Sequence, residues 1–507
     1  MLLLVHIASA GTLADDFSLD AGSWTGDGVV IDGALRVTDG RAELVGMSPG
    51  QVESFELTAR VRMLDGGQLG LRAGDTPIVA DFDGGGALAF GDTRWPLPMS
   101  HLTWVPEADP VFEAAGDSWE AGGVLHCEVV HDADSGTWFL YYTGFFGPPG
   151  YGYRQIGLAT SPDGHTWTRW TGNPVLTIDY SSDIDGVHVH MPSVTVDQLG
   201  LWHMVYACYQ NNVGNRICHA TSPDGYAWTE AGVGLDRGAP GSFDEGSLRM
   251  PDVWLAPDGN WHLWYDGTAP EEHYGATGYA TSVDGWSWVK QGEILPFETA
   301  LQGLGVAETP WGLEAFYNRD DYFVRASADV ATPDVWVEAG VVLTKGWSWW
   351  NDGYIQAPTL ARDGTTWRMW YNGYTYTDGF ERLGTAEGVA TPGQWFDLRL
   401  RWDGSTLAAA IDGAEMPSSE ARMSGAVALD VVGTAELDDV LVVWTDRAVD
   451  TGETGETGDP DGDDSRDSER AAPQAEEGCG CASPSRRVGF VAAGLSLLAG
   501  IRRRTRR

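Results

Sequence analysis

A six-residue phrase recurs three times at a nearly fixed spacing, and this repeat restricts the fold more than any other feature of the chain. It reads ATSPDG at 159–164 and 220–225, and ATSVDG at 280–285. The alanines that begin it, continued by Ala326 and Ala386, are separated by 61, 60, 46 and 60 residues. A period of about 50–60 residues is typical of β-propeller blades. The sequence therefore predicts five repeat units, the fourth of them shortened.

Each unit contains the same elements in the same order. An aromatic-rich strand precedes a strand that ends in the repeat, and a D-G turn and a tryptophan follow. The tryptophans are Trp167, Trp228, Trp288, Trp336 and Trp395. Short apolar runs joined by D-G indicate β-hairpins. This favours Asp163, Asp224 and Asp284 as turn residues over a catalytic role.

The two flanks of the repeat region alternate apolar and polar residues but lack the repeat. Each flank, 15–92 and 395–444, has too few strands to close a sandwich alone. Together they predict a concanavalin-like or laminin-G-like jelly roll, split by insertion of the propeller. The 67 glycines and 24 tryptophans agree with an all-β fold class: a five-bladed β-propeller plus a β-sandwich.

The chain is accordingly divided into six parts. The amino end, MLLLVHIASA, ends in an A-x-A cleavage pattern, with a first core strand as the alternative. Residues 449–478 contain almost no large apolar groups and cannot fold alone. The parts are a signal peptide (1–10), the first part of the sandwich (11–98), the propeller (99–392), the second part of the sandwich (393–447), an acidic linker (448–478) and a sorting and anchor segment (479–507).

The carboxyl end combines a Cys-Gly-Cys, an apolar stretch at 488–501 and the cluster RRRTRR. Fourteen apolar residues are fewer than the roughly 20 of a bilayer span, although flanking arginines can reach the headgroups. With the acidic linker before it, this order resembles the myxobacterial-type carboxy-terminal sorting signal. The resemblance implies export, processing near Cys479 or Cys481, contact with a membrane through this segment, and an outer-membrane, cell-surface or extracellular location.

Charge and cysteine content restrict the partners and the compartment. The formal charge of −42 excludes a nucleic-acid partner, because a phosphate backbone needs stripes of Lys and Arg. Cys208 and Cys218 lie on the two sides of a predicted hairpin centred on Val213. A disulfide in an oxidising compartment and two reduced core cysteines both remain open.

One polar residue per unit stands at the same position of the strand that opens each unit. Innermost strands line a propeller's channel, so these residues predict a polar ring there. Ligand contacts and a mutually hydrogen-bonded plug are both compatible with such a ring. Its members are His126, His190, Arg249, Glu308 and Gln356.

Acidic residues beside aromatic ones precede most of these strands and are expected at the channel mouth. Paired carboxylates can cleave a glycosidic bond, whereas solvated turn acids are the alternative. They occur in Trp119-Glu120, Asp183 and Asp185, Phe243-Asp244-Glu245, and Trp350-Asn351-Asp352. Aromatic residues that do not repeat between units are candidates for stacking on sugar faces. They are Phe145, Phe146, Tyr151, Tyr153, Trp347, Trp349, Trp350, Tyr374 and Tyr376.

Five units closing with A-T-S-x-D-G-x-x-W resemble the five-bladed glycoside hydrolases of families 43 and 32. The resemblance covers the propeller range and implies three inner-strand acids, in a D-P motif of blade one, a D-P motif of blade three and an E-x-P motif of blade four. Glu308 in ETP matches the third and would be the general acid. Cys127 and Met250 stand at the two aspartate positions. Either nearby acids act instead, or catalysis is lost.

Three functions therefore stay open. The first is a secreted glycosidase acting on a polysaccharide or oligosaccharide, with catalytic candidates Glu308, Asp244, Asp185 and Glu120. Its substrate-binding candidates are His126, His190, Arg249, Gln356, Trp119, Trp349, Trp350 and Asp352. The second is a non-catalytic carbohydrate-binding surface protein. The third is a metal site of His126, His190 and Glu308; apart from such a channel-bound cation, no cofactor is expected.

Overall fold

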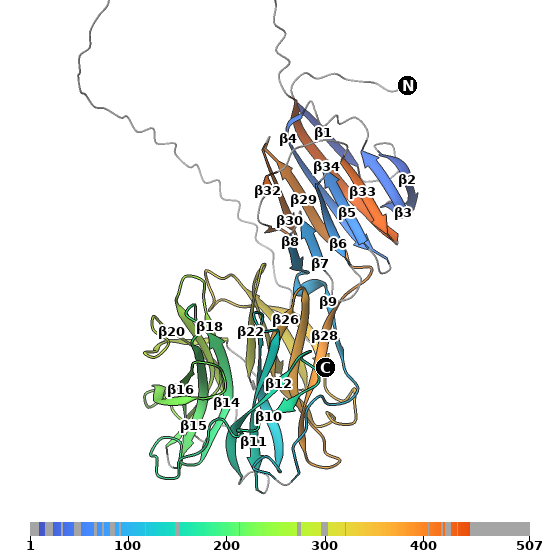
Figure 1. Ribbon diagram of the computed structural model, residues 1–507. Coiled ribbons are helices and arrows are strands. Elements are labelled where there is room, and N and C mark those ends of the chain that lie inside the picture. The colour runs from blue at the N-terminus through green and yellow to red at the C-terminus, as the bar shows by residue number, and fades with distance from the viewer. Residues whose placement is uncertain are drawn as a thin grey trace, which may run out of the picture. The chain divides into compact units, whose positions relative to one another are not determined.

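The computed structural model describes residues 10–446 except 16–23, 32–33, 45–51, 65–67, 74–75, 82–86, 91–92, 117, 148–151, 212, 271–274, 296–302, 320, 404, 417–418, 421–426 and 433. The expected fold class is confirmed: the protein is all-β, with a five-bladed propeller and a β-sandwich built from both flanks (Figure 1). Within the described residues, no helix has the length and apolar character of a membrane span. The signal peptide up to residue 9, the acidic linker and the sorting segment lie outside the described residues.

Each propeller blade is an antiparallel sheet of four strands that follow one another from the channel outwards. Blade 1 holds β10 (Gly123–Asp132), β11 (Thr137–Phe146), β12 (Tyr153–Ser161) and β13 (Thr168–Arg169). Blade 2 holds β14 (His188–Val196), β15 (Trp202–Gln210), β16 (Gly214–Ser222) and β17 (Thr229–Leu235). Blade 3 holds β18 (Ser247–Leu255), β19 (Trp261–Thr268), β20 (Ala276–Ser282) and β21 (Val289–Leu295). Blade 4 holds β22 (Leu304–Thr309), β23 (Gly312–Arg319), β24 (Tyr322–Ala328) and β25 (Val337–Thr344).

The fifth blade closes the ring with a strand from the other end of the propeller. It contains β26 (Tyr354–Asp363), β27 (Thr366–Tyr374) and β28 (Glu381–Ala390), and β9 (Leu102–Pro106) pairs with β28 as the fourth strand. The expectation that Trp395 is the fifth blade tryptophan is therefore wrong. The chain leaves the propeller at this point, and the Trp395 ring packs against the guanidinium groups of Arg60 and Arg62. Their Cζ atoms lie 5.1 and 4.4 Å from the ring centroid.

The repeated hexapeptide forms the turn after the third strand. In blade 1, Asp163 Oδ1 accepts the backbone N–H groups of His165 at 2.9 Å and Thr166 at 2.7 Å. These donors lower the pKa of Asp163. Gly164 closes the turn with a φ of 71°, a conformation that glycine adopts without a steric penalty. Asp224 and Asp284 accept the same bonds in blades 2 and 3, so the interpretation as turn residues is confirmed.

The sandwich interleaves strands from the two flanks. The amino-terminal strands are β1 (Ala10–Asp15), β2 (Trp24–Ile31), β3 (Ala34–Leu44), β4 (Val52–Met63), β5 (Gln68–Ala73), β6 (Thr76–Asp81), β7 (Ala87–Phe90) and β8 (Thr93–Pro96), followed by a 3₁₀ turn, η2 (Met99–His101). The carboxyl-terminal strands are β29 (Phe396–Trp402), β30 (Thr406–Ile411), β31 (Ala414–Glu415), β32 (Ser419–Glu420), β33 (Val427–Val432) and β34 (Thr434–Asp446). The order β29-β4-β34-β3-β33-β5 alternates between the flanks, as the blue and orange strands of Figure 1 show. The centre of the sandwich thus pairs strands of one flank with strands of the other, whereas β5–β8 and β29–β31 extend it by pairs within one flank.

Candidate functional site

Four blades place a non-glycine residue in the left-handed backbone region where the inner strands line the channel. The residues are His126, Met191, Met250 and Ala357, with φ of 46°, 57°, 46° and 51°. Each lies in a β-bulge, at a register shift between the first and second strands of its blade. Positive φ is costly for such residues, so the surrounding structure must hold them there. The same four residues line a pocket at the centre of the channel.

Side chains of the neighbouring blade hold this part of the inner strands. Thr143 Oγ1 accepts the N–H of Met191 at 2.9 Å, and Asn372 Oδ1 accepts the N–H of His126 at 3.4 Å. Asp266 Oδ2 accepts the N–H of Gly303 at 3.1 Å. Thr143, Asp266 and Asn372 occupy equivalent positions on second strands, so each links one blade to the next.

The register of the blades corrects the predicted polar ring. His190, Arg249 and Gln356 do occupy one position of their inner strands. The equivalent residue of β10 is Leu125, and His126 lies one step further along, at the left-handed position. The sequence places His126 one residue too far along, because blade 1 has no proline directly after its left-handed residue, whereas blades 2, 3 and 5 do.

Four of the residues predicted to contact substrate nevertheless come together at the end of the channel where the inner strands begin: His126, His190, Arg249 and Gln356. The Nε2 atoms of Gln356 and His126 are 3.3 Å apart. Arg154 of β12 and His188 of β14, which were not predicted from the sequence, also lie here. They form a parallel bridge across the boundary between blades 1 and 2. We call the set His126, Arg154, His188, His190, Arg249 and Gln356 the channel mouth.

The three histidines of the channel mouth are neutral at pH 7. Burial lowers the pKa of His126, and the positive charges of Arg154 and Arg249 lower it further. Burial and Arg154 also lower the pKa of His190, and they lower that of His188 to about 4. The histidines therefore offer hydrogen-bonding nitrogens, and the positive charge of the channel mouth comes from the two arginines.

Glu381 is the carboxyl group that borders this set, and the sequence reasoning missed it. Its oxygens accept the Tyr354 hydroxyl at 2.6 Å and the Asn372 amide at 3.3 Å. Burial raises the pKa of Glu381 to about 7 despite the nearby Arg154. The repeat contained the signal. Arg154, Asn215 and Glu381 each stand five residues before a repeat alanine, at the start of a third strand. Asn215 Oδ1 accepts a 3.0 Å hydrogen bond from His190 Nε2.

Aromatic side chains gather at the same end of the blades, where second strands end and third strands begin. Tyr354 and Tyr374 stack with their rings 5.0 Å apart, and Tyr376 is 72% exposed. Trp349 is 52% exposed, but the Arg382 guanidinium lies over its ring at 5.0 Å and its indole N–H donates to Asp109 Oδ1 at 3.2 Å. Predicted Asp352 also lies here, but its Oδ1 accepts the N–H of Tyr376 at 3.0 Å.

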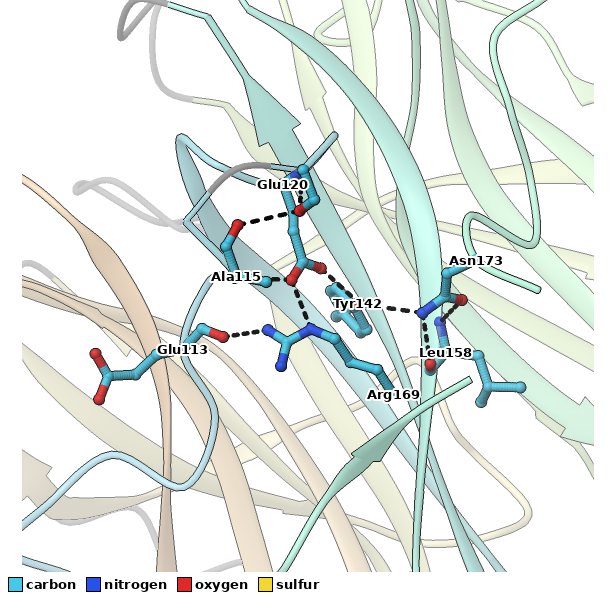
Figure 2. A network of polar contacts seen from close by, with 8 residues as sticks. Glu113, Ala115, Glu120, Tyr142, Leu158, Arg169 and Asn173 are labelled. Carbon is cyan, nitrogen blue, oxygen red and sulfur yellow. Dashed lines mark hydrogen bonds and ion pairs between the residues drawn. The ribbon is translucent and has the colours of Figure 1, made fainter. Parts of the chain in front are cut away.

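Glu120, predicted to be catalytic, is a buried structural residue (Figure 2). It accepts the Tyr142 hydroxyl and Arg169 Nε, both at 2.6 Å, and the N–H of Ala115 at 2.9 Å. The arrangement fixes the loop before β10 to the second and fourth strands of its own blade. Sequence alone places an acid before the strand, but its partners are remote in the chain.

Asp244 has the same structural role in blade 3. It accepts Lys290 Nζ at 2.5 Å, the Ser242 hydroxyl at 2.7 Å and the Tyr265 hydroxyl at 3.0 Å. Burial alone would raise the pKa of Asp244, but these donors more than offset that and hold it below its ordinary value. The carboxylate is therefore engaged on both oxygens, and the geometry does not support it as a catalytic base.

The aromatic residues beside these acids are structural as well. Trp350 is fully buried and stacks on Tyr371 at 5.7 Å, and Trp119 stacks on Tyr142 at 5.9 Å. The rings fill space that glycines leave in the neighbouring strands. The prediction that Trp119 and Trp350 contact substrate is accordingly not supported by their positions.

Asp185 takes the same place in blade 2 but faces another carboxyl. It is buried, its Oδ1 has no hydrogen-bond partner among the described residues, and its charge acts on Glu230. Burial and Asp185 raise the pKa of Glu230 to about 7. Glu230 pairs with Ala220 as Arg169 and Lys290 pair with the repeat alanines of blades 1 and 3. Blade 2 therefore has two carboxyls where its neighbours have a salt bridge.

Glu308 lies away from the channel mouth. It stands beside the hairpin that joins β22 to β23, at the opposite end of the blade, and it is exposed. Its Oε2 accepts the indole N–H of Trp254 at 3.0 Å. The proposed metal set of His126, His190 and Glu308 is therefore not brought together. In the described part of the chain, no group of three or more His, Cys, Asp or Glu side chains is placed to hold a metal ion.

Two further carboxyls lie deeper in the channel. Glu128 and Asp252 line the central pocket from blades 1 and 3. Burial raises the pKa of both, that of Asp252 to about 8, and Asp252 also raises the pKa of Glu128. Asp252 Oδ2 accepts the N–H of Val306 at 3.1 Å, which ties blade 3 to blade 4. At neutral pH this pair holds at least one proton.

Comparison with known proteins reveals a similarity of fold. No protein-family model matches the sequence. No curated protein matches it either. One solved structure is 17% identical over 58% of this chain and 97% of its own, with a TM-score of 0.46. It is described under the GH130 family of mannoside phosphorylases, a family that contains glycoside hydrolases that target β-1,2-mannosidic linkages in Candida mannan.

Two further structures resemble the chain to the same degree. A glycosyl hydrolase from Bacteroides ovatus is 18% identical over 60% of this chain and 97% of its own, with a TM-score of 0.42. A β-1,2-mannobiose phosphorylase from Listeria innocua, in complex with β-1,2-mannobiose, is 12% identical over 56% and 96%, with a TM-score of 0.45. These values carry no functional argument, so the site is interpreted from its own residues.

Proposed function

We propose that this protein is carbohydrate-active, binding a sugar chain at its channel mouth and cleaving it with Glu381 as the general acid. The observation that carries the proposal is the pKa of Glu381, about 7, in a partly buried carboxyl held by Tyr354 and Asn372. A carboxyl that keeps its proton near neutral pH can donate it to a leaving oxygen. The neighbouring rings of Tyr374 and Tyr376 offer flat apolar faces to a sugar.

A non-catalytic carbohydrate-binding protein is the second candidate, and one observation favours it. Glycoside cleavage ordinarily uses a second, ionised carboxylate. Burial raises the pKa of Asp266, a carboxyl near Arg249, to about 7, and this carboxyl accepts the N–H of Gly303. Among the described residues, Glu120 and Asp244 are fixed by their blades and Glu308 lies at the far end.

The experiment compares the wild type with Glu381→Gln on arabinans, xylans, fructans and mannans, with products read by mass spectrometry. We expect Glu381→Gln to lose roughly 10²–10⁴-fold of the release while polysaccharide is still retained. Glu387→Gln is the matched control, because Glu387 is an exposed acid on the same strand, paired with Arg368. Loss in Glu308→Gln with activity kept in Glu381→Gln would instead support the assignment implied by families 43 and 32. Retention without release by any variant would establish the binding protein.

We further propose that the protein is exported and held at the cell surface. Support comes from the A-x-A pattern, from the carboxyl-terminal segment and from the disulfide between Cys208 and Cys218, which suits an oxidising compartment. Mass spectrometry of the mature termini tests this. Processing near Cys479 or Cys481 is expected, and an intact carboxyl terminus in the cytosolic fraction would contradict it.

A further inference from the structure

The channel mouth contains a desolvated positive charge that no described carboxylate neutralises directly. Arg154 is partly buried, its Nε atom is fully enclosed, and it forms no ion pair or side-chain hydrogen bond with the described residues. Burial lowers its pKa, while Glu381 acts on it only from a distance. A desolvated guanidinium without a counter-ion costs folding free energy, so retaining one requires a separate reason.

Three histidine nitrogens share this situation. The Nδ1 atoms of His126, His188 and His190 are buried and have no hydrogen-bond partner. The side chains of His126 and His190 are themselves more than nine-tenths buried, with exposed fractions of 6% and 2%. The Nε2–H of His190 donates to Asn215 Oδ1, so its Nδ1 is an acceptor, whereas Nε2 of His126 accepts from the Gln356 amide and its Nδ1 carries the proton. The unpaired donors that an anion could satisfy are therefore Arg154 Nε of β12 and His126 Nδ1 of β10. Buried polar groups are ordinarily paired, and such a concentration indicates a ligand that pairs them.

The charge balance indicates an anionic ligand. The histidines are neutral at pH 7, whereas Arg154 and Arg249 each carry a full positive charge and both act on His126. Glu381, the carboxyl that acts on Arg154, compensates its charge only in part, because the pKa of Glu381 is about 7. An oxyanion supplies negative charge and acceptor lone pairs together, whereas a sugar hydroxyl supplies no charge. In a chain of net charge −42, this basic group is a local exception.

We propose that the channel mouth recognises the carboxylate of a uronic acid residue between Arg154 and Arg249. The inference rests on the proposed carbohydrate ligand and names its chemical class. A guanidinium group presents paired N–H donors that match the two oxygens of a carboxylate. A singly charged carboxylate also suits two arginines flanked by half-ionised acids better than a doubly charged phosphate does.

The experiment measures binding of matched disaccharides to the full-length protein by calorimetry. Galacturonate, glucuronate and mannuronate disaccharides are compared with their galactose, glucose and mannose counterparts, and with inorganic phosphate and sulfate. Salt of about 0.15 M limits the general repulsion between ligand and protein to about 8 Å. The variants are Arg154→Gln and, as the matched control, Arg362→Gln. Arg362 lies near the β26–β27 hairpin at the other end of blade 5 and donates to Gly364.

At least one uronate is expected to bind ten-fold or more tightly than its neutral counterpart. Arg154→Gln should weaken the uronate far more than its neutral counterpart, and so remove this difference, without lowering the melting temperature, whereas Arg362→Gln should change neither the affinities nor the melting temperature. Equal binding of uronate and neutral sugar would overturn the anion inference while leaving the carbohydrate function intact. Binding of phosphate or sulfate alone would identify an inorganic oxyanion and exclude the uronate. Absence of binding to every sugar would refute the proposed function together with the inference.

Discussion

Replacing Glu230 by lysine should stabilise the protein by giving blade 2 the salt bridge that its two neighbours, blades 1 and 3, contain. Glu120 pairs with Arg169 in blade 1 at 2.6 Å, and Asp244 pairs with Lys290 in blade 3 at 2.5 Å. In blade 2 the equivalent position carries Glu230, which faces the buried Asp185. Glu230→Lys places an ammonium group where blades 1 and 3 have a cation.

The size of the effect follows from the pKa of Glu230. A rise from 4.5 to about 7 corresponds to ~3 kcal/mol of unfavourable interaction between the ionised groups. Because Glu230 is exposed, solvent screening reduces this to roughly 1.5 kcal/mol. The new ion pair contributes about 0.5 kcal/mol more. The total of roughly 2 kcal/mol corresponds to about 4 °C in melting temperature for a unit of this size.

The sign of the pH dependence separates this explanation from general stabilisation. The folded state binds the Glu230 proton more tightly than the unfolded state does. The resulting stability is complete below pH 4.5 and is lost as pH rises through about 7. Glu230→Lys should therefore gain about 4 °C at pH 8 and much less at pH 5, by scanning calorimetry. Glu230→Gln, which only removes the like charge, should show an intermediate gain. An equal gain at both pH values would refute the reasoning.

Three other outcomes are expected. Gly384→Ala should lower the free energy of unfolding, measured by denaturant titration, by about 3 kcal/mol, because the new Cβ would lie 2.1 Å from Cη2 of the buried Trp350. The control Gly116→Ala, whose Cβ would meet nothing within 4 Å, should behave as wild type in the same titration. The double variant Cys208→Ser/Cys218→Ser opens a loop with a sequence separation of 10 and should cost about 3 kcal/mol by chemical unfolding, so an unchanged midpoint would contradict the disulfide. Glycoside release should fall about ten-fold per pH unit above pH 7 as Glu381 loses its proton, and a flat profile to pH 9 would exclude it as the acid.

Much of the fold could be predicted from the sequence because the blade repeat is written in local residues. Ser161, Asp163 and Gly164 form their turn within four positions, so the pattern alone identified it. The closure of blade 5 could not be predicted in this way. Strand β9 lacks the repeat, and its pairing with β28 joins residues 280 or more positions apart.

The candidate site was harder to predict because one residue type serves two purposes. An acid before an inner strand fits a catalytic carboxylate and a structural one equally well. Glu120 is structural only because Arg169, 49 positions later, and Tyr142 lie beside it. Conversely, Glu381 and Arg154 occur on third strands, whereas the predicted catalytic acids lie on a first strand or in the segments just before first strands.

The repeat itself separates structural from functional positions. Positions whose residue type recurs, such as the acid fixed by a tyrosine hydroxyl in blades 1 and 3, hold each blade together. Positions that differ from blade to blade are available for a ligand. Five residues before the repeat alanine the chain has arginine, asparagine, glycine, aspartate and glutamate in successive units. A position needed by every blade would not vary in this way, and three of its members lie at or beside the channel mouth.

Two arginines of blade 1 test this distinction directly. Arg169 belongs to the recurring set and pairs with Glu120, which is 1% exposed, so Arg169→Gln should lower the free energy of unfolding by roughly 2–3 kcal/mol and leave sugar affinity unchanged. Arg154 belongs to the varying set and forms no ion pair with the described residues, so Arg154→Gln should lower affinity and leave stability unchanged or raised. Both variants remove one guanidinium from the same blade, and thermal unfolding and calorimetric titration measure both effects. If both lost stability, or both lost affinity, the separation of the two sets of positions would be wrong.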